Sequence, residues 1–146
     1  MNYRFWGIKS ILFAGTGLII ALINLFSYSS FKGFIYLSMM IILPLLVIYF
    51  YCTKCLCDGK TCAHYFLGRL SELMPDKTEF KYNLFDYFVV IVSVLFLLAF
   101  PQLELFKNKF LFILFWILEG IAFLEINIFV CKNCKNKKCL MCRNQD

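Results

Sequence analysis

Four apolar stretches limit what this chain can fold into more than any other feature. They lie at about 8–26, 34–51, 84–103 and 110–130 in a chain of 146 residues. A helix needs about 20 apolar residues to cross the hydrocarbon core of a bilayer. Hydrocarbon offers no hydrogen-bond partner to peptide N–H and C=O groups, so each stretch must satisfy its own backbone as a helix. We therefore predict an all-α integral membrane protein, a bundle of four transmembrane helices that forms one domain over 1–146.

The composition excludes an ordinary soluble domain. Hydrophobic residues make up 62% of the chain, charged residues 16%, and the mean hydropathy is +0.76. Soluble domains are usually about 45 to 50% apolar. The lipid bilayer is therefore the first partner that the sequence predicts.

The basic residues predict the orientation. Four spans place both termini and the 52–83 connection on one side of the membrane, and the loops 27–33 and 104–109 on the other. Of the 15 lysines and arginines, twelve lie on the side of the termini, and the three on the opposite side are Lys32, Lys107 and Lys109. Because basic residues concentrate in cytoplasmic loops, we expect a cell-membrane protein with both termini in the cytoplasm.

Eight cysteines form two clusters, and each cluster directly follows an apolar stretch. The 52–62 cluster has the spacing C-x2-C-x-C-x4-C, and the 131–142 cluster has the spacing C-x2-C-x4-C-x2-C. The members are Cys52, Cys55, Cys57, Cys62, Cys131, Cys134, Cys139 and Cys142. On a reducing cytoplasmic face such patterns favour metal over disulfides. Four thiolates complete a tetrahedral zinc shell, so we predict one or two structural Zn²⁺ sites in a cysteine-rich cytoplasmic cap.

Several alternatives stay open for these cysteines. Iron–sulfur clusters also use four cysteines, although neither spacing matches the common ferredoxin patterns. The thiols could also be unmetallated, handle copper or iron transiently, or form disulfides if the orientation is inverted. The two clusters could be separate sites or cross-braced, and His64 could replace one cysteine as a ligand.

The segment at about 63–74 is predicted to be a short amphipathic helix that ends before Pro75. Its apolar residues fall on one helical stripe: Phe66, Leu67, Leu70, Leu73 and Met74. Beside a membrane, such a helix is expected to lie in the headgroup plane. In the apolar stretches themselves, Gly15 and Gly17 predict a close helix contact, and Pro101 predicts an end or bend of the third helix.

Two glutamates interrupt the fourth apolar stretch. Glu119 lies near its middle, and Glu125 lies six residues before Cys131. A carboxylate in hydrocarbon costs several kcal/mol, so it must be protonated, face the bundle interior or be paired. Glu125 is expected to reach toward the basic cytoplasmic side. Glu119 is either part of a proton or cation relay, or a protonated group bonded across the bundle to one of Ser38, Ser93, Thr16 and Asn24.

Lysines lie within and beside the cysteine clusters. They are Lys54, Lys60, Lys132, Lys135, Lys137 and Lys138. They fit the positive-inside bias and attraction to anionic lipid headgroups, or they balance an anionic metal–thiolate centre or bind an acidic partner. Nucleic acid is not an expected partner, because the basic residues lie against the bilayer and are not interleaved with exposed stacking aromatics.

Three function classes follow from these features. The chain contains no Ser/His/Asp set and no phosphate-binding loop, so we do not expect an enzyme on its own. The favoured hypothesis is a small accessory or anchoring subunit, whose metal sites form a docking platform for a partner protein on the cytoplasmic face. The first alternative is an iron–sulfur electron-transfer subunit. The second is a soft-metal transporter or sensor with Glu119 in the path.

Overall fold

The computed structural model describes residues 3–55, 65–75 and 81–131. Within these ranges every regular element is helical, and four helices are long: α1 (Tyr3–Tyr28), α2 (Ser30–Phe50), α4 (Leu84–Ala99) and α6 (Lys109–Glu125). Four segments are long and apolar enough to cross a membrane: Arg4–Tyr28, Ser30–Lys54, Leu84–Leu105 and Lys109–Val130. The predicted all-helical fold with four candidate membrane spans is confirmed.

Short helical turns complete the long helices. They are η1 (Cys52–Lys54), α3 (Tyr65–Ser71), α5 (Gln102–Leu105) and the π-helical turn η2 (Ile126–Val130). The third apolar stretch, predicted as one span, is divided: α4 ends at Ala99, and α5 begins directly after Pro101. Proline has no N–H to donate to the preceding turn, which explains the break that the sequence predicted at this point.

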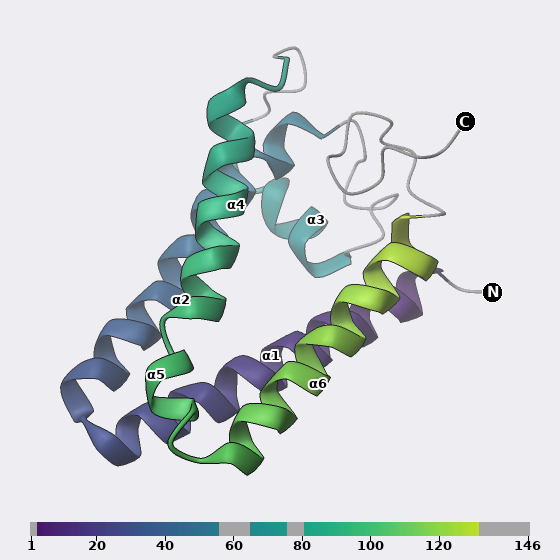
Figure 1. Cartoon of the computed structure of the whole chain (residues 1–146). Coiled ribbons are helices and arrows are strands. Elements are labelled where there is room, and N and C mark those ends of the chain that lie inside the picture. The colour runs from purple at the N-terminus through teal and green to yellow at the C-terminus, as the bar shows by residue number, and fades with distance from the viewer. Residues whose placement is uncertain (1–2, 56–64, 76–80, 132–146) are drawn as a thin grey trace.

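The long helices form two antiparallel pairs, α1 with α6 and α2 with α4, and α1 also packs on α2. Figure 1 shows these pairs as two arms that meet at one end and diverge toward the other. We name the end where α1 turns into α2 the closed end, and the end with the N-terminus, η1 and Cys131 the open end. The four-helix bundle is therefore open and V-shaped.

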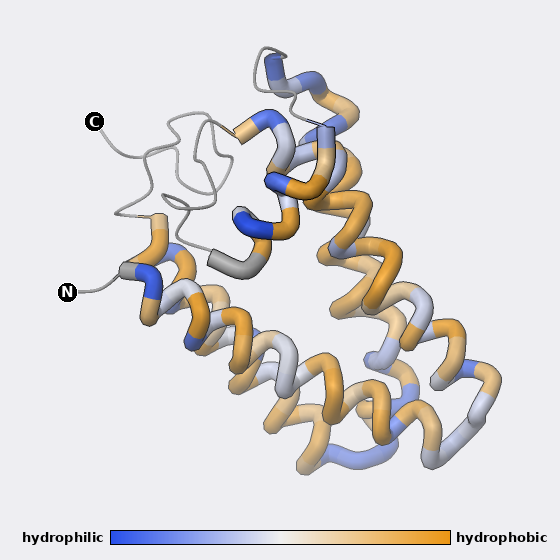
Figure 2. The backbone as a smooth tube through the Cα atoms, turned by 180° about the vertical axis from the view of Figure 1, so that it is seen from behind, coloured by the Kyte–Doolittle hydropathy of each residue, from blue (hydrophilic) through white to orange (hydrophobic). Residues whose placement is uncertain are grey.

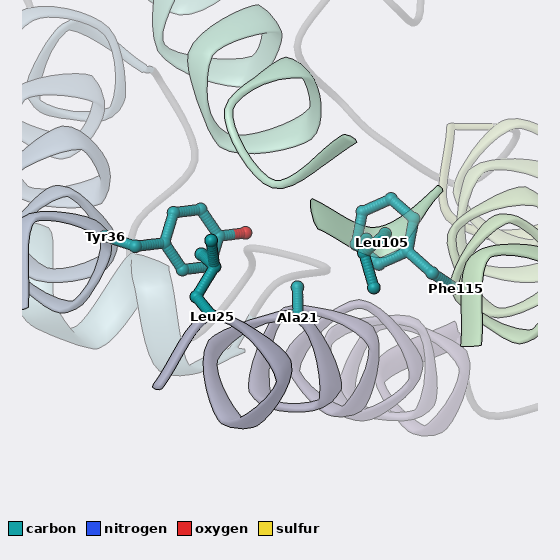
Figure 3. Close-up of a cluster of buried hydrophobic side chains, with 5 residues drawn as sticks. All are labelled: Ala21, Leu25, Tyr36, Leu105 and Phe115. Atoms are coloured by element: carbon teal, nitrogen blue, oxygen red, sulfur yellow. The ribbon is translucent and has the colours of Figure 1, made fainter. Parts of the chain in front are cut away.

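A cluster of five buried side chains joins the two arms near the closed end. It contains Ala21, Leu25, Tyr36, Leu105 and Phe115, which come from α1, α2, α5 and α6 (Figure 3). Tyr36 also reaches α4, the one long helix that contributes no side chain to this cluster, because its hydroxyl donates a 2.9 Å hydrogen bond to the Leu97 carbonyl.

The contact between α1 and α6 relies on small residues of α1. Gly7, Ser10, Gly17 and Ala21 are buried along it, and small residues let helices approach closely in lipid. A Cβ atom on Gly17 would lie only 2.7 Å from Glu119 Oε1, so the close contact predicted for Gly17 is confirmed. For Gly15 the same prediction is wrong, because nothing lies within 4 Å of the position of its Cβ.

Large apolar side chains are exposed on all four long helices. Leu12, Ile41, Leu95 and Phe123 are examples, one from each helix. In Figure 2 hydrophobic residues cover the length of both arms, and hydrophilic residues gather at their ends. An exposed apolar surface of this extent is unfavourable in water and favourable in a bilayer.

The helix α3 is shorter than predicted and lies between the arms. It covers Tyr65–Ser71, whereas 72–74 form a turn, and residues 63–64 lie outside the described ranges. It packs against α1, α2 and η1 at the open end (Figure 1). The predicted placement of this helix in the headgroup plane stays a prediction.

The turn from α1 into α2 offers a test of this packing. A Cβ atom on Gly33 would lie 2.6 Å from the Phe26 ring, and overpacking of this kind typically costs about 1 to 3 kcal/mol. Gly33→Ala should therefore lower the midpoint of thermal unfolding in detergent. Gly15→Ala is the matched control, because its Cβ meets open space and should not lower the midpoint. Equal midpoints for the two variants would contradict the packing at Gly33.

Candidate functional site

The structure describes part of the predicted metal site. Cys52, Cys55 and Cys131 lie in the described ranges, whereas the other candidates lie outside them: Cys57, Cys62, His64, Cys134, Cys139 and Cys142. Among residues 3–55, 65–75 and 81–131, no group of three or more His, Cys, Asp and Glu could hold a metal ion. The zinc, iron–sulfur and cross-bracing predictions therefore stay predictions.

The first C-x2-C pair occupies a tight turn at the end of α2. The η1 turn follows the helix directly, and the backbone N–H of Cys55 donates a 3.0 Å hydrogen bond to the Cys52 carbonyl. A turn closed in this way keeps the first and fourth Cα atoms within about 7 Å. Two sulfurs placed like this can reach one metal ion, as the spacing predicts.

A buried ion pair holds this turn against the start of α4. Lys54 Nζ lies 2.6 Å from Asp86 Oδ2, and the two side chains are only 11% and 3% exposed. The same carboxylate oxygen accepts a 2.7 Å hydrogen bond from the Asn83 backbone N–H. Lys54 is therefore bound to Asp86 and is not presented to lipid headgroups. Attraction to the headgroups was one interpretation of its position in the sequence.

Two further hydrogen bonds fix the turn from both sides. The Thr53 hydroxyl donates to the Tyr49 carbonyl at 2.7 Å, within the α2 segment. The Tyr82 hydroxyl donates to the Tyr51 carbonyl at 3.4 Å, and the two rings lie 4.8 Å apart. The C-x2-C turn is thus attached to both helices of its arm.

The second cluster begins at the end of the other arm. Lys9 Nζ of α1 lies 2.8 Å from Glu125 Oε1 of α6. Glu125 was expected to reach toward basic residues, and the basic residue that it contacts belongs to the neighbouring helix α1. Beyond it, the rings of Trp6 and Phe129 stack with centroids 4.0 Å apart. The η2 turn then leads to Cys131, which is buried.

Cys131 is disulfide-bonded, and neither Cys52 nor Cys55 takes part in a disulfide. Metals bind the thiolate form of cysteine, so Cys131 can act as a ligand only after reduction. The sequence leaves disulfides open as an alternative in case the membrane orientation is inverted. The disulfide at Cys131 corresponds to that alternative.

The starts of the two clusters share one end of the molecule. Figure 1 places η1 and the end of η2 at the open end, together with the N-terminus. This is the arrangement that an even number of spans predicts. Which face of the membrane the open end occupies stays a prediction from the charge count.

Glu119 lies inside the α1–α6 interface and faces Gly17. Its Oε1 atom is buried and makes no hydrogen bond within the described residues. Two of the side chains proposed as its partners are bonded elsewhere: the Thr16 hydroxyl donates to the Leu12 carbonyl, and the Ser38 hydroxyl donates to the Ile35 carbonyl. The choice between the two interpretations of Glu119 stays a prediction.

An ion cluster at the closed end was missed in the sequence. Lys32 Nζ lies 2.5 Å from Glu104 Oε1, and Lys107 Nζ lies 2.5 Å from Glu104 Oε2. The hydrogen bond to Glu104 raises the pKa of Lys107 above its ordinary value. The spacing of Glu104 and Lys107 at i and i+3 could have indicated their ion pair from the sequence. The contact between Lys32 and Glu104 could not be found in this way, because only the tertiary fold brings the two residues together.

A half-open apolar cavity of about 340 Å³ adjoins this ion cluster. Its lining residues are Leu25, Lys32, Phe96, Ala99, Phe100, Leu103 and Glu104. The charged pair at its edge links the start of α2 to α5.

Comparison with protein-family models, with curated proteins and with solved structures finds no match for this chain. Function is therefore argued from the site alone.

The Lys54–Asp86 pair should be essential to the fold of its arm. Asp86→Asn leaves a buried, unpaired lysine, which typically costs about 3 to 5 kcal/mol. Lys107→Gln is the matched control, because Lys107 is 55% exposed and exposed pairs contribute about 0 to 1 kcal/mol. The measurement is the unfolding midpoint of each variant, and similar losses for both would contradict the role of the buried pair.

The double variant Lys54→Met/Asp86→Leu separates the ion pair from general disruption. Because it removes both charges, it should recover part of the stability that Asp86→Asn loses. No recovery would show that the shape of the pair matters more than its charge.

Proposed function

We propose that this protein is a small accessory or anchoring subunit of a membrane complex, whose cysteine clusters bind structural zinc and form a docking platform for a partner protein. One observation carries the proposal: both clusters begin at the open end, each directly after a helix that is tied to its neighbour by an ion pair. The four apolar helices supply the anchor.

The firm attachment of the first C-x2-C turn supports a structural role for the metal. Cys52 and Cys55 flank Lys54, whose ammonium is held by Asp86. A turn fixed by three side-chain contacts can present two thiolates without rearrangement. Closed four-thiolate sites are the usual form of structural zinc.

The proposal requires the reduced form of the second cluster. Cys131 must be released from its disulfide before it can bind zinc. A reducing cytoplasm provides that condition, and the excess of basic residues on the side of the termini favours a cytoplasmic location for the open end.

Elemental analysis tests the metal. Protein purified under reducing, anaerobic conditions should hold about two zinc ions per chain and show no visible absorption. Cys52→Ser/Cys55→Ser should lose zinc, whereas Thr53→Ser, between the two cysteines, keeps every thiol and should retain it. Iron with acid-labile sulfide would replace the zinc platform with the electron-transfer alternative, and absence of metal in the reduced protein would contradict both.

Copurification tests the docking platform. Protein extracted from its native membrane in mild detergent should retain a soluble partner in fixed ratio. Cys52→Ser/Cys55→Ser should release the partner while the membrane anchor stays intact, and Thr53→Ser should not. A stable, zinc-loaded chain that copurifies with no other protein would count against the anchoring role.

A further inference from the structure

The α1–α6 interface holds three polar atoms that the fold leaves unsatisfied. Buried side-chain atoms without a hydrogen-bond partner in the described residues include Asn24 Nδ2, Glu119 Oε1 and Glu125 Oε2. Asn24 belongs to α1, and both glutamates belong to α6, the helix packed against it. A buried polar group without a partner costs several kcal/mol in hydrocarbon. Three such atoms in one interface require an explanation outside the protein's own contacts.

These atoms follow one another along the membrane-spanning direction. The antiparallel register is fixed by Lys9 opposite Glu125 and by Gly17 opposite Glu119. Glu119 and Glu125 are six residues apart on α6, or about 9 Å. Asn24 is seven residues beyond Gly17 on α1, or about 10 Å. Because each hydrogen bond spans about 2.8 Å, a chain of two or three water molecules can bridge each interval.

The surroundings of Glu119 favour a proton over a metal ion as its occupant. Lys9 and Glu125 of the same interface neutralise each other at 2.8 Å. Tyr36 of α2 is a further titratable group within electrostatic reach, and its hydroxyl donates to the Leu97 carbonyl. A metal ion needs several ligands, and the described residues offer it no group of three. A single carboxylate with one proton is neutral and suits an apolar medium.

We propose that the α1–α6 interface carries protons between the two ends of the helices, with Glu119 as the central relay. A hydronium ion at one end gives a proton to the Glu119 carboxylate, which leaves a water molecule and a neutral carboxylic acid. The acid then gives the proton to water on the other side, which re-forms the carboxylate and a hydronium ion, and no electron is transferred. Glu125 and Asn24 position water on either side of Glu119. This activity is independent of the zinc platform.

Proton flux through purified protein in liposomes tests the proposal. The full chain is reconstituted around an internal pH-sensitive dye, a pH gradient is applied, and potassium with valinomycin clamps the membrane potential. Liposomes with the protein should lose the gradient faster than empty liposomes, and Glu119→Gln should return the rate to that of empty liposomes. A wild-type rate equal to that of empty liposomes, or an unchanged rate in Glu119→Gln, would overturn the relay.

A matched glycine pair tests the position of the relay. Gly17→Ala places a methyl group 2.7 Å from Glu119 Oε1 and should slow the flux, whereas Gly15→Ala meets open space and should not. Equal slowing by both variants would indicate a general distortion of α1 and would count against the site.

Labelling of the wild-type chain keeps the proposal testable if Glu119→Gln does not fold. A hydrophobic carbodiimide reacts with protonated carboxyl groups in lipid and should modify Glu119 and stop the flux. Glu125, which is paired with Lys9, should not be modified, and peptide mass spectrometry distinguishes the two. Modification of Glu119 without loss of flux would overturn the proposal.

Discussion

Contact between α1 and α6 is the interaction on which the rest of the structure depends. Two helices in hydrocarbon gain nothing from the hydrophobic effect by meeting, so they associate through close packing and polar contacts. α1 supplies a face of small residues, and α6 supplies Glu125 for Lys9 and Glu119 against Gly17. Because η2 follows α6 directly, the same contact decides where the second cysteine cluster begins.

The closed end converts this helix pair into a four-helix structure. The buried cluster around Tyr36 and Phe115 couples α1 and α6 to α2, and Tyr36 extends the coupling to α4 through Leu97 (Figure 3). Since the arms are joined at one end only, η1 and the end of η2 lie at the open end, on separate arms (Figure 1).

Polar side chains along the helices are of two kinds, those that form ion pairs and those with a buried atom that is not hydrogen-bonded within the described residues. At the helix ends they are paired: Lys54 with Asp86, Lys9 with Glu125, and Lys32 with Glu104. Between these ends, Glu119 and Asn24 keep buried atoms that have no hydrogen-bond partner among the residues that the structure describes. Paired groups stabilise the arms, whereas unpaired groups in an apolar medium are the places where a proton or water from outside can bind.

The sequence by itself determined the helices and the common end of both clusters. Each membrane helix makes its own backbone hydrogen bonds. The length of each apolar stretch, the even number of spans and the position of Pro101 can therefore be read directly from the sequence. Only the tertiary structure decided that the bundle is open, that Lys54 binds Asp86, that α3 lies between the arms and that Gly17, unlike Gly15, contacts α6. These features depend on which face of one helix contacts another. Because apolar residues lie on nearly all sides of these helices, the sequence pattern does not show which face makes the contact.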